Sequence, residues 1–225
     1  MKTTLSIGIV MILLLACVGA VSAALIPNGG FEFPNPGGSW STYQNGYLGL
    51  VWKVEQGIGA PAGITPTLEI QKQGAFSPAL APFEGTQFAE LDSYANANIS
   101  QMISVTAGNT YTISFAQACR PDGGEIPSLL GVYWGGTYLG QTTCSQTNTW
   151  VTHSYAPTAP STGLIKLMFV DEGTSNSYGV LLDAVDIQEK QNNTPVPEFP
   201  SLAIPAALIV WLIGAVFFIQ KSKEN

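Results

Sequence analysis

The middle of the chain is a series of short segments rich in β-branched and aromatic residues, separated by clusters of Gly, Pro, Asn and Ser. In TYTISFAQA, Tyr111, Ile113 and Phe115 alternate with smaller or polar residues, a period of two that is typical of a strand with one buried face. Away from the two apolar ends, no long stretch has the 3.6-residue period of a helix. We therefore predict an all-β domain over residues 24–188, a jelly-roll sandwich of two antiparallel sheets. The expected strands are 49–54, 67–73, 86–92, 98–105, 110–118, 129–134, 137–143, 150–156, 163–170 and 178–187, with Gly135-Gly136 as a tight hairpin turn.

The first 23 residues have the pattern of a secretory signal peptide. Lys2 precedes an apolar core from Leu5 to about Gly19, and small residues lead up to a cleavage site after Ala23. The core is shorter than the roughly 20 residues that a spanning helix needs, which argues against an uncleaved membrane anchor. A lipoprotein signal with Cys17 as the lipidated residue is a further alternative, disfavoured because the residues after Cys17 stay apolar.

The other end of the chain predicts a membrane anchor. Residues 202–219 are eighteen consecutive uncharged residues, long enough for one transmembrane helix. Lys221 and Lys223 place the tail 220–225 on the cytoplasmic side, so the domain is expected outside the cell, attached by a linker over 189–201. The prolines of that linker favour an extended chain that holds the domain away from the membrane.

A short motif precedes the apolar run. Pro197, Glu198, Phe199 and Pro200, followed by the apolar segment and a basic tail, resemble the PEF-CTERM sorting signal of archaeal surface proteins. The resemblance implies that a membrane-embedded archaeosortase cuts near the motif and attaches the product to a lipid. The two prolines disfavour helix around the Glu-Phe pair and leave it accessible, in agreement with such a role. A plain single-pass anchor is the alternative, and the short tail, with only two lysines, departs from the usual pattern.

The net charge excludes some classes of binding partner, and the cysteines bear on the cellular compartment. Residues 24–200 contain fourteen acidic and five basic residues, a net charge near −9 that repels nucleic acid and anionic membrane. Once the signal peptide is removed, Cys119 and Cys144 remain, and in an oxidising compartment they predict one disulfide, with two buried thiols as the alternative. Sequons begin at Asn98 and Asn192 and are candidate glycosylation sites.

An ordered set of short motifs runs through the domain. It opens with Asn28-Gly29-Gly30-Phe31-Glu32, continues with Gly85-Thr86-Gln87 and Leu91-Asp92, and closes with Leu182-Asp183-Ala184-Val185. This set resembles the galactose-binding-like jelly rolls, and most of all a cell-surface family with plant cell-wall relatives, long classed as a domain of unknown function. Ala184 departs from the acidic residue or Asn usual in that family.

The resemblance implies a structural calcium ion shared by the first and last strands. Its ligands would be Glu32 and Asp183, with backbone carbonyls around Asn28 and Gly30, since Ca²⁺ takes six to eight oxygens. The alternative is that the two carboxylates cap turns and accept hydrogen bonds from backbone amides.

Exposed aromatic rings are the candidates for binding a glycan, because sugar rings have flat C–H faces that stack on them. We expect Trp52 and Trp150, which fall inside strand patterns, to be core residues instead. For any one of the remaining rings, simple packing is the competing interpretation. The candidates are Trp40, Tyr43, Tyr47 and Tyr94, in stretches that read as loops, and Tyr133 and Trp134, which adjoin the Gly135-Gly136 turn.

No catalytic motif is evident. His153 is the only histidine and lies in a strand pattern, with no Gly-x-Ser-x-Gly sequence to pair with it. A glycosidase would need two facing carboxylates, and the candidates are Glu90, Asp92, Asp171 and Glu172, of which the last two read as a solvated turn. We predict a non-catalytic domain that binds glycan or envelope polysaccharide at the cell surface. The alternatives are an envelope or adhesion protein with a protein partner and, as a minor one, a glycoside hydrolase.

Overall fold

A computed structural model describes residues 24–123 and 126–190 of the chain, and these residues form eleven strands. Within these two stretches no helix is long and apolar enough to cross a membrane. The strands are β1 (Trp40–Gln44), β2 (Lys53–Gln56), β3 (Thr67–Lys72), β4 (Gln87–Glu90), β5 (Ala97–Val105), β6 (Thr110–Ala118), β7 (Ser128–Trp134), β8 (Thr137–Cys144), β9 (Trp150–Tyr155), β10 (Gly163–Asp171) and β11 (Leu181–Lys190).

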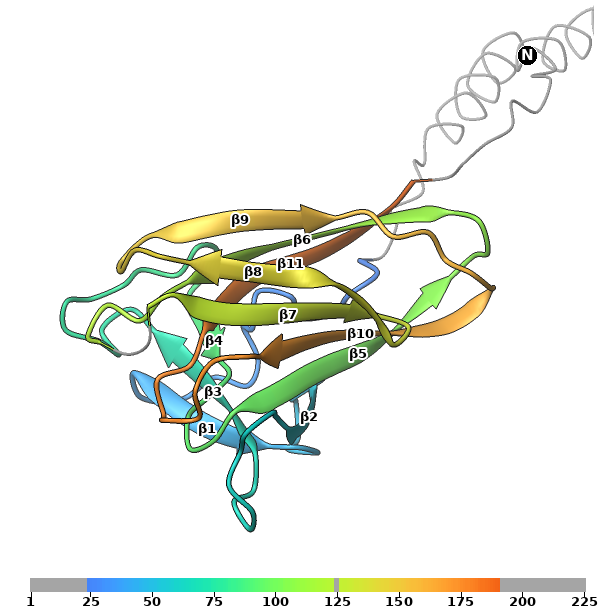
Figure 1. The fold of residues 1–225 in the computed structure, drawn as a ribbon. Coiled ribbons are helices and arrows are strands. Elements are labelled where there is room, and N and C mark those ends of the chain that lie inside the picture. The colour runs from blue at the N-terminus through green and yellow to red at the C-terminus, as the bar shows by residue number, and fades with distance from the viewer. Residues whose placement is uncertain (1–23, 124–125, 191–225) are drawn as a thin grey trace, which may run out of the picture. The chain divides into compact units, whose positions relative to one another are not determined.

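The strands pair into two antiparallel sheets that pack face to face (Figure 1). The six-stranded sheet has the order β1-β3-β4-β11-β6-β9, and the five-stranded sheet has the order β2-β5-β10-β7-β8. The last strand, β11, therefore lies in the middle of its sheet between β4 and β6, so the sandwich closes only when both ends of the domain are in place. The predicted all-β jelly-roll sandwich is confirmed.

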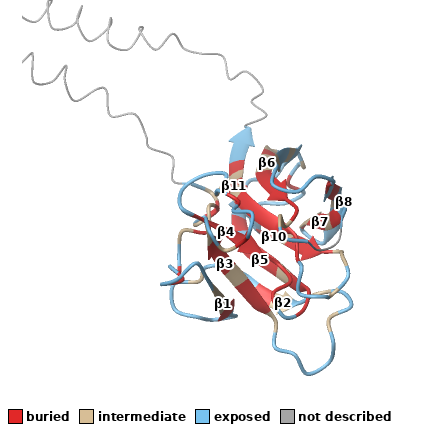
Figure 2. Cartoon of the chain, turned by 90° about the vertical axis from the view of Figure 1, so that its left-hand side faces the viewer, coloured by how far each residue is buried: buried red, intermediate tan, exposed pale blue. Residues whose placement is uncertain are grey.

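Apolar side chains at alternating positions of the strands fill the space between the sheets. Tyr111, Ile113 and Phe115 of β6 are buried there, as their spacing predicts, together with Trp52 and Phe169 from the five-stranded side. Figure 2 shows this core as red strands beneath pale-blue loops. Fully burying such a large apolar side chain contributes roughly 1.5–3 kcal/mol, so the residues facing this layer set the register of both sheets.

A second, smaller apolar cluster covers part of the outer face of the six-stranded sheet. The segment between β3 and β4 supplies Phe76 and Leu80, which pack on Phe88 of β4 and Leu181 of β11. Trp150 of β9 joins this cluster, and its indole N–H donates to the Ala81 carbonyl at 2.9 Å. Trp150 is therefore a packing residue, like Trp52, as the sequence predicts.

The predicted disulfide is present. Cys119 follows β6 directly and Cys144 ends β8, and their Cα atoms are 5.6 Å apart. The bond therefore ties the six-stranded sheet to the five-stranded sheet at one end of the sandwich.

Several strand bounds differ from the sequence prediction; β2 (Lys53–Gln56), for example, was expected at residues 49–54. Trp40–Gln44, read as part of a Gly- and Ser-rich loop, is strand β1 and pairs with β3 along its whole length. Strand β11 continues to Lys190, so Glu189 and Lys190 belong to the sheet and not to the linker. The signal peptide, the remainder of the linker with its sorting motif, the apolar run 202–219 and the tail lie outside the described residues.

Candidate functional site

Polar side chains gather on the outer face of the six-stranded sheet, beside the second apolar cluster. Leu68 and Ile70 of β3 point into the core, so the alternating Glu69 and Gln71 point outward. On β4 the core residue is Ala89, and Glu90 takes the outward position next to Glu69, its cross-strand partner. Three groups that can accept hydrogen bonds thus lie side by side on two neighbouring strands, and of these only Glu69 is partly exposed.

Arg120 connects this polar face to the loops above it. It follows the disulfide residue at the end of β6, and its Nη1 donates to Glu90 Oε1 at 2.8 Å. Its Nε and Nη2 donate to the two oxygens of Asp122 at 3.1 and 3.0 Å. The guanidinium carbon lies 4.8 Å from the ring centroids of both Phe76 and Tyr178, so the cation lies over two aromatic rings.

We name Glu69, Gln71, Glu90, Arg120 and Asp122 the Glu90–Arg120 cluster. Glu90 is fully buried and accepts hydrogen bonds from Arg120, from the Gly179 N–H at 2.8 Å and from Gln71 Nε2. Gln71 Nε2 also donates to Glu69 Oε1 at 2.8 Å. Burial, together with the charge of the neighbouring Glu69, raises the pKa of Glu90 to about 8. The charge of Arg120 acts in the opposite direction.

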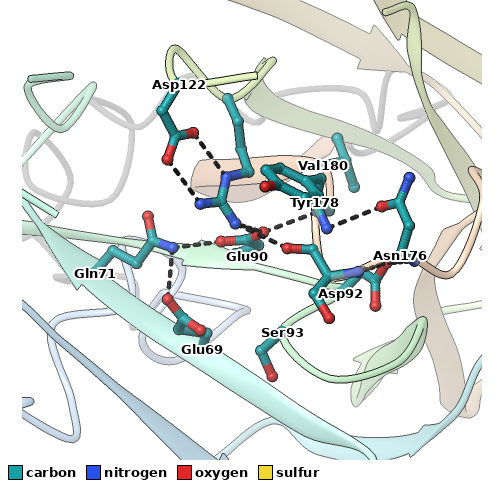
Figure 3. Close-up of polar contacts among 12 residues, drawn as sticks. Glu69, Gln71, Glu90, Asp92, Ser93, Asp122, Asn176, Tyr178 and Val180 are labelled. Atoms are coloured by element: carbon teal, nitrogen blue, oxygen red, sulfur yellow. Dashed lines mark hydrogen bonds and ion pairs between the residues drawn. The ribbon is translucent and has the colours of Figure 1, made fainter. Parts of the chain in front are cut away.

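Asp92 fixes the loop that carries Tyr178. Its Oδ2 accepts hydrogen bonds from the backbone N–H groups of Asn176 and Ser177 at 2.8 and 2.9 Å, and burial raises its pKa (Figure 3). The loop then passes so close to the sheet that a Cβ at Gly179 would collide with the Asp92 backbone. Glycine at this position lets Tyr178 reach the guanidinium of Arg120.

Two partly exposed aromatic rings adjoin the cluster. Trp40 of β1 is the cross-strand partner of Gln71 and is 49% exposed. Tyr178 stacks on Arg120 and is 43% exposed. Polar acceptors beside exposed rings are the combination that sugars require, with rings for their C–H faces and acceptors for their hydroxyls.

The other predicted aromatic residues separate into two groups. Tyr47 and Tyr94 are exposed, and Tyr133 is half-buried on β7 with its ring centroid 4.9 Å from that of Tyr138. Tyr43 and Trp134 are buried in the core, so the loop expected around Tyr43 was wrong and neither ring is exposed for stacking on a ligand. Both lie on strands at positions where the alternation points inward.

Trp134 also contributes to a small pocket at one end of the sandwich. The pocket has a volume of about 200 Å³ and is lined mostly by apolar side chains from the β7–β8 hairpin and from the segment before β10. Its lining residues are Trp134, Gly135, Thr137, Leu139, Pro157, Thr158 and Pro160. With so few polar groups, the pocket is less suited to a sugar than the outer sheet face.

Glu32 and Asp183 lie where the two ends of the domain meet. Asp183 Oδ2 accepts hydrogen bonds from the N–H groups of Phe83 and Glu84 at 2.8 and 3.1 Å, and Glu32 Oε1 accepts those of Thr86 and Gln87 at 2.7 and 3.0 Å. The start and end of the domain are also joined by the Val185 N–H, which donates to the Gly29 carbonyl at 3.0 Å. The two carboxylates thus hold the segment before β4 by hydrogen bonds.

The same carboxylates have few free lone pairs left to bind calcium. Asp183 Oδ1 and Glu32 Oε2 each accept a single hydrogen bond, from the Ala184 N–H and the Thr86 hydroxyl, and so keep a lone pair. Over residues 24–123 and 126–190, no group of three or more His, Cys, Asp or Glu side chains is arranged to hold a metal ion. Most of the six to eight oxygens would therefore have to be backbone carbonyls, and calcium binding here stays a prediction.

The carboxylates considered for glycoside hydrolysis have structural partners. Asp171 is buried and accepts hydrogen bonds from the N–H groups of Gly173 and Val180 at 2.8 and 3.0 Å, so the reading of this residue as part of a solvated turn was wrong. Glu172 directly follows β10 of the five-stranded sheet, and its Oε2 accepts a hydrogen bond from Gln141 Nε2 at 2.6 Å. His153 packs its ring 5.5 Å from that of Phe115, and burial lowers its pKa.

The sequence analysis singled out neither Glu69 nor Tyr178, and it also missed Arg120. Arg120 sits in ACRPDGG, which reads as a turn, and its partner Glu90 lies 30 residues earlier in the chain. One signal was available: Arg120 is the only arginine of the chain, in a domain with few basic residues.

Comparison with known proteins shows the fold. No protein-family model matches the chain, and no curated protein matches it significantly. Among solved structures, TmCBM61 in complex with β-1,4-galactotriose is similar at 18% sequence identity and a TM-score of 0.50, covering 75% of this chain and 100% of its own. A family 35 carbohydrate-binding module from Clostridium thermocellum has 11% identity and a TM-score of 0.42, covering 67% of this chain and 98% of its own. The C-terminal CBM6 of the laminarinase LamC from Zobellia galactanivorans has 17% identity and a TM-score of 0.38, covering 53% and 87%. The described domain thus has a jelly-roll fold similar to that of TmCBM61.

Proposed function

We propose that the domain binds a glycan at the outer face of the six-stranded sheet, over the Glu90–Arg120 cluster, and does so without catalysis. The observation that carries the proposal is the arrangement of Trp40 and Tyr178 beside this cluster. Both rings are about half exposed, and the acceptors beside them are fixed by hydrogen bonds from Gln71 to Glu69 and from the Gly179 N–H to Glu90. A site fixed before binding loses little conformational entropy when a ligand arrives.

The first contacts follow from this geometry. The exposed face of Trp40 stacks on a sugar ring, and the half-exposed carboxylate of Glu69, on the neighbouring strand, accepts a hydroxyl hydrogen bond. Arg120 and Asp92 do not contact the sugar. They position Tyr178 and the loop around it. The fold similarity to TmCBM61, whose structure contains a galactotriose, supports glycan as the ligand class but does not identify the sugar.

The two ends of the chain place this domain, in our proposal, at the cell surface. A signal peptide directs export, and the apolar segment 202–219 anchors the product in the membrane with the domain outside. Processing near Glu198 by an archaeosortase, with attachment to a lipid, completes the proposal. Intact-mass measurement of the protein purified from its native cells tests both cuts. A mature chain that begins after Ala23 and ends near Glu198 supports processing, and a chain that retains residues 202–225 supports a plain anchor.

A protein partner is the second candidate, because the segment between β1 and β2 exposes apolar side chains. Leu48 is 93% exposed, and Tyr47 and Val51 are about half exposed. Exposed apolar residues that lie close together often mark a protein interface.

A glycan array with the full-length protein separates the two functions. Saturable binding to a glycan that is lost in Trp40→Ala and kept in Leu48→Ser supports the glycan proposal. Failure on neutral and acidic glycans alike contradicts it and favours the protein partner. Release of reducing ends from a bound polysaccharide would instead reveal a hydrolase.

A further inference from the structure

The cation of the site has almost no hydrogen-bonding capacity left for a ligand. A guanidinium has five N–H donors. The Nε and one Nη2 donor of Arg120 bind Asp122, and Nη1 donates both to Glu90 and to the Ser177 carbonyl at 3.0 Å. Phe76 and Tyr178 lie near its planar faces. Arg120 therefore cannot form the bidentate pair by which arginine normally binds a carboxylate or sulfate.

Acceptors, by contrast, exceed donors at this site. Glu69 Oε1 accepts a hydrogen bond from Gln71, and the carboxylate is only half-buried. Gln71 Oε1 and Asp92 Oδ1 are buried, and within the described part of the chain neither has a donor. A ligand that brings donors to the accessible Glu69 carboxylate improves this balance, whereas a ligand that brings another anionic acceptor worsens it.

The charges around the cluster also disfavour an anionic ligand. Glu69 and Asp122 carry two negative charges against the single positive charge of Arg120, and Glu90 adds a third where it is ionised. Lys72, the cation on β3, donates its ammonium N–H to Asn35 Oδ1 at 2.8 Å. An anionic sugar at the cluster would therefore meet partly buried negative charge that solvent screens poorly.

From these observations we infer that the site, if it binds glycan as proposed above, selects uncharged sugars and excludes those with carboxylate or sulfate groups, and that Glu69 determines this selectivity. The inference rests on the proposed function and adds the ligand class to it. Glu69 is the residue that matters because, of the carboxylates on β3 and β4, it is half-buried whereas Glu90 is fully buried.

The test uses one glycan in two charge states. A neutral polysaccharide that the full-length protein binds is oxidised at C6, so that hydroxymethyl groups become carboxylates while the backbone and linkage stay the same. Calorimetric titration then compares both forms with wild type, Glu69→Gln and Asp186→Asn. Asp186 is a matched acidic control on β11 whose carboxylate accepts a hydrogen bond from Gln188.

We expect wild type and Asp186→Asn to bind the oxidised form at least about tenfold more weakly than the neutral form. In Glu69→Gln this ratio should fall to about threefold or less, because a carboxylate is replaced by a neutral amide of similar shape. Equal affinity of wild type for both forms, or the same ratio in wild type and Glu69→Gln, would overturn the inference and leave glycan binding intact. Failure to bind any neutral glycan would overturn the proposed function together with the inference.

Discussion

The Nη1 of Arg120 lies 2.8 Å from Oε1 of Glu90, and this ion pair joins the end of β6 to the end of β4 on the outer face of the six-stranded sheet. Glu90 is fully buried, while the Arg120 side chain is 17% exposed. The pair therefore lies at the boundary between the packed sheet and the surface where we place the ligand. It holds Tyr178 through the face of the guanidinium, so the stability of the domain and the shape of the site depend on the same contact.

Removal of Arg120 should destabilise the domain strongly. Above pH 8, where Glu90 is ionised, Arg120→Ala leaves its carboxylate buried without its cation, which typically costs about 3–5 kcal/mol. Asp122→Asn removes a partner that is 29% exposed and should cost less than about 1 kcal/mol. Denaturant unfolding of the three proteins measures the difference.

A double variant provides the control for this prediction. In Arg120→Ala/Glu90→Gln no buried charge is left unpaired, so the loss should be smaller than in Arg120→Ala alone. A single Arg120→Ala variant as stable as Asp122→Asn would show that the ion pair does not stabilise the fold.

The stability of the domain should fall as the pH rises through neutrality. The pKa of Glu90 is raised from 4.5 to about 8 by burial, and that of Asp183 from 3.8 to about 7. Between its unfolded and folded pKa values each group is protonated in the folded state and ionised in the unfolded chain, so the folded state binds more protons there. The free energy of unfolding is therefore highest at the acidic end of this window and decreases toward pH 8, by more than about 1.4 kcal/mol, the equivalent of one pKa unit.

Glu90→Gln isolates the contribution of one residue. The variant cannot titrate at this position, so its free energy of unfolding should vary less with pH than that of wild type. Parallel curves for the two proteins would contradict the raised pKa of Glu90.

Much of the fold followed from local pattern, and the site did not. Strand β6 was predicted with its observed bounds because Tyr111, Ile113 and Phe115 alternate without interruption. Strand β1 was missed because its neighbours are Gly- and Ser-rich, and only its pairing with β3 makes it a strand. Trp40 was identified as a ligand candidate for its residue type, not for its position opposite Gln71.

Burial could not be read from local sequence either. Asp171 lies next to Glu172 and Gly173, which suggests a turn in water, yet its carboxylate accepts backbone N–H groups in the interior. The pairing of Glu90 with Arg120 depends on which strands become neighbours across β11. Periodicity gives the faces of a strand but not its neighbours.

The disulfide should contribute substantially to stability. Cys119 and Cys144 are 25 residues apart, and a cross-link of that length contributes about 3–4 kcal/mol in the chain-entropy model. The double variant Cys119→Ala/Cys144→Ala should unfold at correspondingly lower denaturant concentration. Added reductant should lower the stability of wild type but leave the variant unchanged, and equal sensitivity of both proteins to reductant would contradict the bond.

Calcium binding where the two ends of the domain meet should change the Tm of the protein. If Glu32 and Asp183 hold calcium, as the sequence predicts, added calcium raises the Tm of wild type by mass action. Asp183→Asn should lose this rise and should also be less stable in chelator, because it weakens acceptance of the Phe83 and Glu84 N–H groups. An unchanged wild-type Tm in calcium and in chelator would contradict the calcium prediction and leave the hydrogen-bonded junction in place.

The central claim is that glycan binds beside Trp40, and calorimetric titration of full-length wild type, Trp40→Ala and Tyr138→Ala with a neutral polysaccharide tests it most directly. Tyr138 is 47% exposed, against 49% for Trp40, but it lies on the other sheet. We predict saturable binding by wild type and Tyr138→Ala, and at least about tenfold weaker binding by Trp40→Ala. Equal affinities of wild type and Trp40→Ala, or loss of binding in Tyr138→Ala alone, would contradict the account.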